Sequence, residues 1–354
     1  MCDRVHDGLS DAELGERLAT RVLELIDIPS ESRDEAALAS HVAEVLRAGG
    51  VVVEELDDCG VLAGPARARV VLAGHLDTVP SQANRPGSRE ADRVLGLGAS
   101  DMKSALAVML ELALTAAPYR LLFFPREELP VADSALTPLL ESHRLDQELV
   151  LMMEPTDNAI HAGCLGNVNA EWTFRGRSGH SARPWLADNA IERAAAGISA
   201  LAVHPPEPHE FAGLVFREVA CVTRIAGGIA GNVIPDQVTC HLNYRYAPGR
   251  SPQGAEVRLA ELCKGHGELA VTSNAPSGAV PSENGLLESF KAIGNLPVAP
   301  KQAWTPVAEF ALAGYDAVNF GPGAPDQAHR RDESVEIAAL VRCTRVLERF
   351  AREL

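Results

Sequence analysis

The sequence lacks long apolar runs, paired cysteines and two common signatures of hydrolases. No hydrophobic stretch approaches the ~20 residues of a membrane-spanning helix, and the N-terminus is charged. The seven cysteines form no C-x-x-C pair, which is typical of reduced thiols in the cytoplasm. Neither a G-x-S-x-G nucleophile elbow nor an H-E-x-x-H metal motif occurs. We therefore expect a cytoplasmic protein that has no membrane anchor and uses neither of those two hydrolytic motifs.

Basic residues are also scarce. The chain has 32 Lys and Arg residues against 48 Asp and Glu residues, so its formal net charge is −16. A charge of this sign repels a phosphate backbone and anionic lipid unless the basic residues cluster on one face. We therefore expect neither nucleic acid nor a membrane as a partner.

The sequence does contain enough apolar residues for a core, with strands and helices in alternation. Its 354 residues, 46% hydrophobic and 23% charged, are those of a globular protein larger than a typical domain of ~100–200 residues. Hydrophobic strands at 69–73, 120–124 and 148–153 alternate with helical patterns at 104–116 and 134–143. This order predicts an α/β fold with a central parallel or mixed sheet covered by helices.

The stretch from about 167 to 272 follows a different pattern. Its expected order of strand, helix, two strands, helix and strand is that of a ferredoxin-like α+β unit. The alternation of helix and strand then resumes and ends in a helix over 335–353. The sequence therefore predicts a domain at 167–277 inserted into a larger domain formed by 1–166 and 278–354.

His75 and Asp77 form the first candidate site. A hydrophobic strand over 70–74 delivers both to the carboxyl end of a sheet, where ligands collect in open α/β folds. Asp77 lies on the same side of the strand and can accept the ring N–H of His75, which leaves the other ring nitrogen for a metal. Taken alone, the pair is also what a solvated strand end would show.

Acidic residues mark three further segment ends. Asp101 closes the glycine-rich turn Gly96-Leu-Gly-Ala-Ser-Asp101, where a dinucleotide fingerprint would have its third glycine, so a nucleotide loop is excluded and a helix N-cap remains the alternative. Glu127 and Glu128 end an apolar strand, where they need a cation or a proton unless water solvates them. Glu154 ends another strand with a buried pattern.

A histidine in a late loop completes the set. His329 lies in a Gly/Pro-rich loop before the last helix, and alone it would be read as a surface residue. The other four, His75, Asp101, Glu128 and Glu154, follow one another at intervals of 26 or 27 residues. Each interval is about one strand–helix unit, so all four can gather at one rim of the sheet.

Two histidines and three carboxylates suit a pair of divalent ions such as Zn²⁺, with one carboxylate bridging them. Such ions polarise a carbonyl and activate a water, and Glu127 could take the proton of that water and pass it to a leaving amine. We therefore predict amide hydrolysis with two Zn²⁺ per subunit, or Co²⁺ as an alternative ion.

The motifs G-H-L-D-T-V-P, G-L-G-A-S-D-M-K, the Glu-Glu pair, M-E-P-T and A-H-R-R-D-E-S appear in this order along almost the whole chain. In this the chain resembles the di-zinc amidohydrolase family that includes acetylornithine deacetylase, carboxypeptidase G and succinyl-diaminopimelate desuccinylase. The resemblance implies a role for each candidate: Asp101 bridges two ions, His75 and Glu154 hold one, Glu128 and His329 hold the other, Glu127 is the general base, and Asp77 orients His75.

The resemblance also implies that the inserted domain is a lid and dimerisation domain, and that the protein is a homodimer. His180, in G-R-S-G-H, matches a lid histidine that reaches the partner's active site and stabilises an oxyanion. Asn232, Arg245 and Thr305 match substrate-binding positions, Arg245 as a carboxylate clamp. The residues alone leave structural alternatives open: His180 could be a structural histidine, Asn232 a turn residue and Arg245 a residue on a strand surface.

Within the family, A-G-C-L-G-N, H-S-A-R-P-W-L-A-D-N-A-I and the Trp304-Thr305 segment most resemble succinyl-diaminopimelate desuccinylases of the actinobacterial type. One position departs, because Glu309 stands where those enzymes carry an arginine. If that arginine meets a substrate carboxylate, Glu309 would repel it. The substrate could then be another N-acyl amino acid, including one with an amine at this point.

The expected reaction is hydrolysis of a small N-acyl amino acid, N-succinyl-LL-2,6-diaminopimelate, to succinate and LL-diaminopimelate, a step of lysine and peptidoglycan precursor biosynthesis. Two alternatives share the scaffold: an acetylornithine-type deacetylase and a zinc carboxypeptidase. A third, of another class, is a non-catalytic amino-acid-binding or scaffold protein on the same fold.

Overall fold

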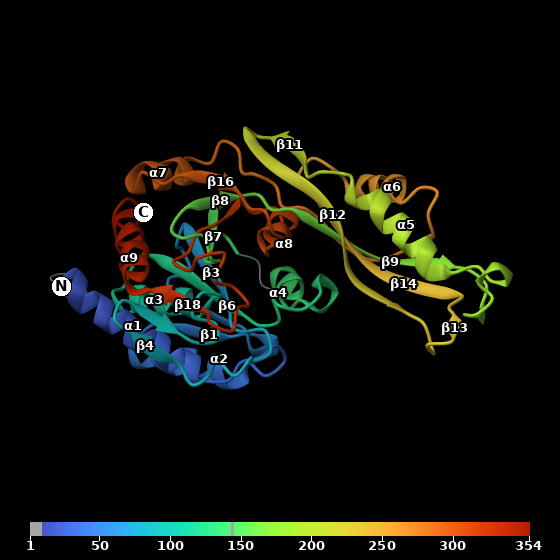
Figure 1. Ribbon diagram of the computed structural model, residues 1–354. Helices are drawn as coiled ribbons and strands as arrows, with labels where there is room; N and C mark the ends of the chain where they lie inside the picture. The colour runs from blue at the N-terminus through green and yellow to red at the C-terminus, as the bar shows by residue number, and fades with distance from the viewer. Residues whose placement is uncertain (1–8, 143–144) are drawn as a thin grey trace. The chain divides into compact units, whose positions relative to one another are not determined.

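The computed structural model describes residues 9–142 and 145–354, which divide into two compact units (Figure 1). Unit 1 comprises the residues up to Ala162 together with Pro281–Ala299 and Glu309–Leu354, and unit 2 comprises Gly163–Val280 and Pro300–Ala308. The charged N-terminus, Cys2 and the end of the helix expected at 134–143 lie outside the described residues.

Unit 1 is built on an eight-stranded sheet of order β1-β2-β6-β3-β7-β17-β8-β16. β3 runs parallel to β6 and β7, and β17 runs parallel to β7, whereas β2–β6 and β17–β8 are antiparallel pairs. The strands are β1 (Val53–Glu55), β2 (Val61–Ala63), β3 (Val70–His75), β6 (Tyr119–Phe124), β7 (Leu149–Met152), β8 (Ile160–Ala162), β16 (Val298–Pro300) and β17 (Ala317–Asn319). The predicted mixed α/β sheet is confirmed.

Helices α1, α3 and α9 pack against one another beside this sheet (Figure 1). α1 begins after Ser10, whose side chain and that of Glu13 form a capping box, and it buries Leu14, Leu18 and Val22 along one face. The helices outside the inserted region are α1 (Asp11–Asp27), α2 (Ala36–Ala48), α3 (Lys103–Leu114), α4 (Leu136–Ser142), α7 (Gly285–Gly294), α8 (Val307–Leu312) and α9 (Ile337–Ala351), with short 3₁₀ turns at Asp57–Cys59 and Val131–Asp133. None of the helices in the described ranges has the length and apolar character needed to cross a bilayer.

A small three-stranded sheet corrects one expectation about spacing. β4 (Ser88–Glu90) and β5 (Arg93–Leu95) form a hairpin, and β18 (Ser334–Glu336) pairs with β5. The chain between His75 and Asp101 therefore contains this hairpin and no helix. The two residues approach each other because the hairpin returns the chain to the sheet edge, rather than through a strand–helix unit.

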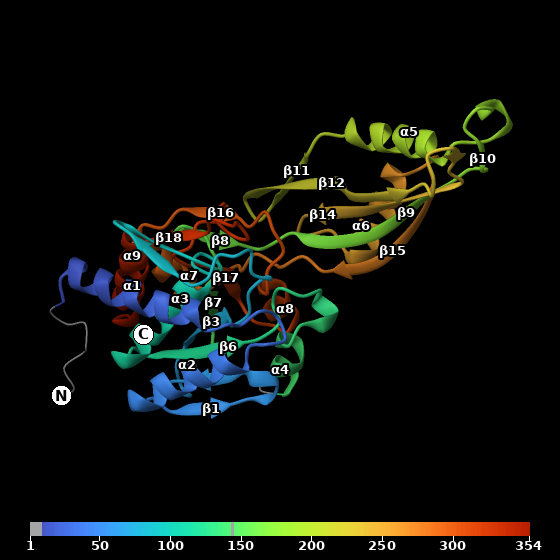
Figure 2. The ribbon, with the colours of Figure 1, turned by 60° about the horizontal axis from the view of Figure 1, so that its bottom comes forward.

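Unit 2 is a five-stranded antiparallel sheet of order β11-β12-β14-β9-β15 (Figure 2). Its main elements are β9 (Gly166–Arg175), α5 (Ala190–Ala202), β11 (Glu207–Phe211), β12 (Leu214–Gly227), β14 (Gln237–Tyr246), α6 (Pro252–Leu262) and β15 (Glu268–Ala275), with a short 3₁₀ turn at Pro184–Leu186. Apart from the edge strand β11, this is the ferredoxin-like order. Alternate residues of β9 and β14, including Trp172, Phe174 and Leu242, pack with α5 and α6 in one buried core.

The apolar pattern over 233–246 predicts one strand, but in the structure this strand is interrupted near its start. β13 (Val233–Ile234) pairs with β10 (Gly179–His180), and β14 begins only at Gln237. Pro235 lies between them and has no N–H to donate to a ladder, so the chain changes partner there.

Candidate metal centre

Three parallel strands bring acidic and imidazole side chains to one edge of the unit 1 sheet. His75 is the last residue of β3, Glu127 and Glu128 follow β6, and Glu154 follows β7. Because β6 and β7 both pair in parallel with β3, their carboxyl ends lie side by side. The position of these four residues is therefore a direct consequence of the sheet order.

His75 is buried, and its ring is oriented by the main chain. Its Nδ1 lies 2.9 Å from the backbone carbonyl oxygen of Asp77. Because a carbonyl can only accept, Nδ1 carries the proton in this arrangement. Nε2 then faces the carboxylates, 3.1 Å from Asp101 Oδ1 and 3.8 Å from Glu154 Oε1.

The spacing of Asp77 suggests that its carboxylate accepts the ring N–H of His75, but this carboxylate accepts hydrogen bonds from other groups. It lies 3.6 Å from His75 Nδ1 and accepts hydrogen bonds from the backbone N–H groups of Glu127 (2.9 Å) and Glu128 (3.0 Å). Ser32, which the sequence did not single out, donates to it as well (2.8 Å). Asp77 thus orients His75 through its carbonyl oxygen and fixes the acidic pair through its carboxylate.

Asp101 lies between the two histidines. Its Oδ1 faces His75, and its Oδ2 is 3.6 Å from His329 Nε2, which is also 3.0 Å from Glu128 Oε1. His329 belongs to the loop after β17, which leaves the sheet at the same edge because β17 is parallel to β7. A Cβ at Gly321, at the start of this loop, would lie 2.3 Å from the carbonyl oxygen of Met153, so only glycine permits this close approach.

Six residues at this edge form three overlapping groups, each with ligand atoms within 4.8 Å of one another. The groups are His75, Asp101 and Glu154; His75, Glu127 and Glu128; and Asp101, Glu128 and His329. All five residues expected as ligands occur in these groups. Asp101 belongs to two of them, the group with His75 and Glu154 and the group with Glu128 and His329. Imidazole and carboxylate donors in such clusters suit zinc and similar divalent ions.

The charges of this edge favour a bound cation. Burial, followed by the charge of Glu154, raises the pKa of Glu127 well above its ordinary value. Burial alone would lower the pKa of His75, but the carboxylates of Asp101, Glu127 and Asp77 outweigh it and raise the pKa. The hydrogen bond that His329 donates to Glu128 raises the pKa of His329 to about 9. Without a cation the edge therefore binds protons tightly, and divalent ions would replace those protons.

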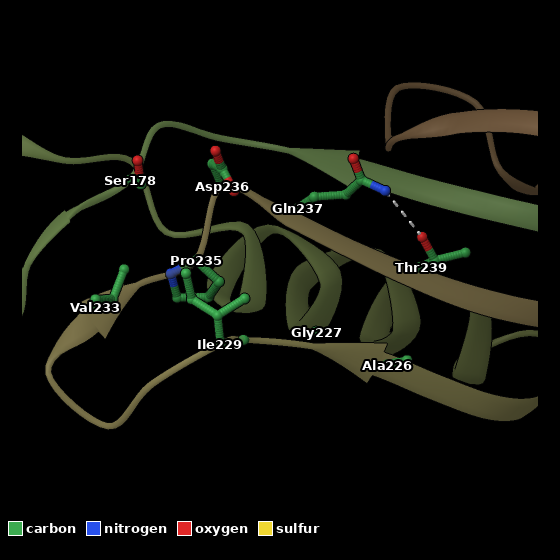
Figure 3. A pocket seen from close by; sticks show the side chains of 10 residues that line it. Ser178, Ala226, Gly227, Ile229, Val233, Pro235, Asp236, Gln237 and Thr239 are labelled. Carbon is green, nitrogen blue, oxygen red and sulfur yellow. Dashed lines mark hydrogen bonds between the residues drawn. The ribbon is translucent and has the colours of Figure 1, made fainter.

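Two of the residues expected in the inserted domain are exposed on unit 2. His180, at the end of β10, accepts a hydrogen bond at Nδ1 from the N–H of Ala182 (3.0 Å), and the carbonyl oxygen of Asn232 accepts one from Ser181 (3.0 Å). A hollow of about 370 Å³ lies beside them, and the residues that line it include Gly227, Ile229, Val233, Pro235 and Asp236 (Figure 3). The segment carrying Asn232 connects two sides of this hollow.

The other two expected substrate residues of unit 2 are Arg245, which forms no ion pair among the described residues, and Thr305, which has an unsatisfied hydroxyl group. Arg245 is half-buried on β14, where it donates to Asn243 Oδ1 (2.8 Å), and burial lowers its pKa. No carboxylate within the described ranges pairs with it. Thr305 is buried, and its Oγ1 has no hydrogen-bond partner in the part of the chain that the structure describes. Buried polar groups of this kind are suited to a ligand.

Glu309 is buried and serves the local structure of unit 1. Its Oε1 accepts hydrogen bonds from Ser134 Oγ (2.9 Å), Thr137 N (3.1 Å) and Thr137 Oγ1 (2.6 Å) at the start of α4. A carboxylate is favoured at a helix N-terminus because the first N–H groups of the helix have no partner inside it. The sequence alone did not reveal this contact, which joins residues far apart in the chain.

Glu333 is the main residue that the sequence reading missed. It is buried and accepts hydrogen bonds from the backbone N–H groups of Gly98 (3.0 Å), Ser100 (2.8 Å) and Asp101 (2.9 Å). Glu333 lies near His329 in a loop rich in acidic and basic residues. Nothing in the sequence distinguishes it from the exposed charged residues beside it.

Comparison with known proteins gives relatives along nearly the whole chain. The chain is 39% identical over 341 residues to a Mycobacterium tuberculosis protein named as a succinyl-diaminopimelate desuccinylase (DapE), covering 92% of this chain and 95% of that protein. It is 35% identical to the succinyl-diaminopimelate desuccinylase of Corynebacterium glutamicum, covering 93% and 94%. An Aspergillus clavatus protein named as a carboxypeptidase is 29% identical over 69% of this chain and 61% of its own length.

Solved structures share the fold. A Staphylococcus aureus tripeptidase matches with a TM-score of 0.77 at 20% identity, covering 96% of this chain and 99% of that one. The Bacillus subtilis YXEP protein, described as a dinuclear metal-binding peptidase from the M20 family, matches with a TM-score of 0.68 at 17% identity, covering 97% and 98%. The model of peptidase family M20/M25/M40 matches residues 71–353. With this match and relatives of more than 30% identity over most of its length, the chain belongs to peptidase family M20/M25/M40.

Proposed function

We propose that this protein hydrolyses the N-acyl amide of an amino acid with two divalent metal ions, and that its substrate is N-succinyl-LL-2,6-diaminopimelate. The observation that carries the proposal is the set of overlapping ligand groups that share Asp101. The choice of acyl group rests on the names of the mycobacterial and corynebacterial relatives. The products would be succinate and LL-diaminopimelate, which serve lysine and peptidoglycan precursor biosynthesis in the cytoplasm.

Two Zn²⁺ ions, or Co²⁺ in their place, fit the residues present. His75, Asp101 and Glu154 would hold one ion, and Asp101, Glu128 and His329 would hold the other. When bound, such ions polarise an amide carbonyl and lower the pKa of a water. Asp77 would keep the proton on His75 Nδ1, so that Nε2 remains a ligand.

Glu127 is the proposed general base. Its backbone is held by Asp77, and its side chain belongs to the group of His75 and Glu128. Burial, followed by the charge of Glu154, raises its pKa, which makes it a better proton acceptor. Glu127 would accept a proton from the attacking water and deliver it to the nitrogen of the leaving amine. The C–N bond then breaks with a neutral amine as the leaving group.

Unit 2 supplies the proposed contacts to the substrate. Arg245 has no acidic partner among the described residues, which suits a clamp for a substrate carboxylate. Asn232 and Thr305 are the proposed hydrogen-bonding groups. His180, which is exposed, is proposed to stabilise the oxyanion in the active site of a partner subunit.

We also propose that the inserted domain, at 167–277, acts as a lid and joins two subunits into a homodimer. β11 pairs with β12 only from Leu214 to Glu218, so the rest of β12 has no partner along its outer edge within the described residues. Ile225 on this strand and Ile191 on the adjacent α5 are exposed. Pairing with a second copy would cover both the open edge and these apolar side chains.

A carboxypeptidase is the second candidate, since a relative carries that name. An acetylornithine-type deacetylase would use the same metal edge with a different acyl pocket. A non-catalytic binding or scaffold protein would be expected to have lost a ligand or the base, and this chain retains His75, Asp101, Glu127, Glu128, Glu154 and His329.

The test is a comparison of substrates on metal-free protein reloaded with Zn²⁺ or Co²⁺. We expect release of succinate from N-succinyl-LL-2,6-diaminopimelate, with a kcat/KM at least about 100-fold above that for N-acetylornithine or a peptide ending in glutamate, because a missing buried polar contact is costly. Cleavage of acetylornithine alone would refute the desuccinylase assignment. No cleavage of any substrate by the reloaded protein would refute the hydrolase assignment.

Glu127→Gln tests the base within the same assay. We expect kcat to fall by a factor on the order of 10²–10⁴ while two ions still bind, because a general base contributes about that much. Glu288→Gln, an exposed position on α7, is the control and should retain full turnover. Full activity of Glu127→Gln would remove this residue from the mechanism.

A further inference from the structure

The loop that carries Asp101 folds around a buried carboxylate. Glu333 Oε1 accepts hydrogen bonds from the N–H groups of Ser100 and Asp101, and Oε2 accepts one from Gly98. Glu333 is 2% exposed, and the charges of Lys103 and His329 act on it. Its direct hydrogen-bond donors are three main-chain N–H groups, which together form a concave anion site.

The loop that carries Asp101 and the loop that carries His329 and Glu333 are joined by further contacts. The N–H of Gly96 donates to the carbonyl oxygen of Glu333 (3.0 Å), and Ser100 Oγ donates to the carbonyl oxygen of Ala324 (2.9 Å). A Cβ at Gly323 would lie 2.2 Å from the carbonyl oxygen of Ser100, so the backbones are in close contact there. The segment that carries Asp101 and the loop that carries His329 are thus held together by hydrogen bonds and close backbone contact.

The direction of the Asp101 side chain depends on this backbone. Oδ1 faces His75 at 3.1 Å and Oδ2 faces His329 at 3.6 Å, so a small rotation of the residue would displace both oxygens from their partners. The N–H of Asp101 itself donates to Glu333, one residue from the Ser100 N–H that does the same. Glu333 fixes the residue from which that side chain projects.

From these contacts we infer that Glu333 is a positioning residue for the shared ligand Asp101, and that it sets the affinity of both metal positions without touching an ion. The inference rests on the proposed function, because it assumes that Asp101 binds metal. An outer partner of this kind typically changes metal affinity by about 10–100-fold when it is removed.

Two variants of graded severity test the inference. Glu333→Ala leaves all three N–H groups without their acceptor. Glu333→Gln can still accept from Ser100 and Asp101 but presents an NH₂ group to the N–H of Gly98. We expect Zn²⁺ affinity, measured on metal-free protein by competition with a chromophoric chelator, to fall about 10–100-fold in the alanine variant and by less in the glutamine variant. The visible spectrum of the Co²⁺-loaded variants should change in shape as the ligands are displaced.

Glu111→Ala is the matched control. Glu111 is also fully buried, but it lies on α3 and pairs with Arg17 and Arg21 on α1. Its loss should lower the urea midpoint of the metal-free protein and leave Zn²⁺ affinity within twofold of wild type. A Glu333→Ala protein that remains folded and binds both ions with unchanged affinity and spectrum would overturn the inference. Failure of the wild-type protein to bind two ions would instead refute the proposed function.

Discussion

At the scale of single residues, the carboxylates around this sheet edge have two different roles. Asp101 and Glu154 face the imidazole of His75, whereas Asp77 and Glu333 hold backbone N–H groups around the same edge. Residue type and the order of the strand ends were sufficient to predict the first kind, although Asp101 reaches the edge through the β4–β5 hairpin and not through the strand–helix unit that its spacing suggested. They could not reveal the second kind, since the partners are main-chain atoms brought close only by folding.

Glu309 allows a pH-dependent test at this scale. Burial raises its pKa above the ordinary value, so the folded protein binds this proton more tightly than the unfolded chain does. Its contribution to stability is full below the unfolded pKa of about 4.3 and is lost as the pH rises through the folded pKa. Glu309→Gln removes the titration and keeps an oxygen that can accept from Ser134 and Thr137.

We therefore expect the urea midpoint of metal-free Glu309→Gln, relative to wild type, to rise between pH 4 and pH 8. Glu288→Gln on the surface of α7 is the comparison and should show a much smaller trend. A difference between Glu309→Gln and wild type that is constant with pH, or that falls toward pH 8, would contradict this expectation. The same variant, assayed on succinyl and acetyl substrates, also measures whether position 309 affects substrate choice.

At the scale of secondary structure, the long and strongly periodic elements were predictable and the short ones were not. α1, α3 and α9 and the strands β3, β6 and β9 have apolar repeats long enough to identify them. The hairpin β4–β5 and the two-residue strands β10 and β13 do not, because pairing between distant segments decides so short a strand. Pro235, which breaks the expected long strand, is visible in the sequence, but its effect depends on the β10 partner.

The open edge of β12 gives a prediction for an element. Ile225→Lys places a charge in the proposed interface, and we expect light scattering to show loss of the dimer, because an unpaired cation is costly to bury. Turnover should fall with it, since His180 is proposed to act in the partner's active site. Val257→Lys, at an exposed apolar position on α6, is the control and should remain dimeric and active. A wild-type protein that is monomeric and fully active at micromolar concentration would refute the proposed interface.

At the scale of the whole molecule, the order of the motifs along the chain carried the family assignment, and the family match agrees with it. The mixed sheet explains why the five proposed ligands from His75 to His329 converge, because four of the strands or loops that carry them leave the same sheet edge. The sequence could not reveal the hydrogen bonds that hold this edge in place, such as those made by Ser32 and Glu333, because each of them joins segments that are far apart in the chain.

Anomalous X-ray scattering at the zinc edge, from crystals of the Zn²⁺-loaded protein, tests the shared metal edge most directly. We predict two peaks about 3.5–4 Å apart, one beside His75 and Glu154 and the other beside Glu128 and His329, with Asp101 bound to both. A single peak at full loading, or two peaks that share no carboxylate, would contradict the two-ion centre on which the proposed hydrolysis depends.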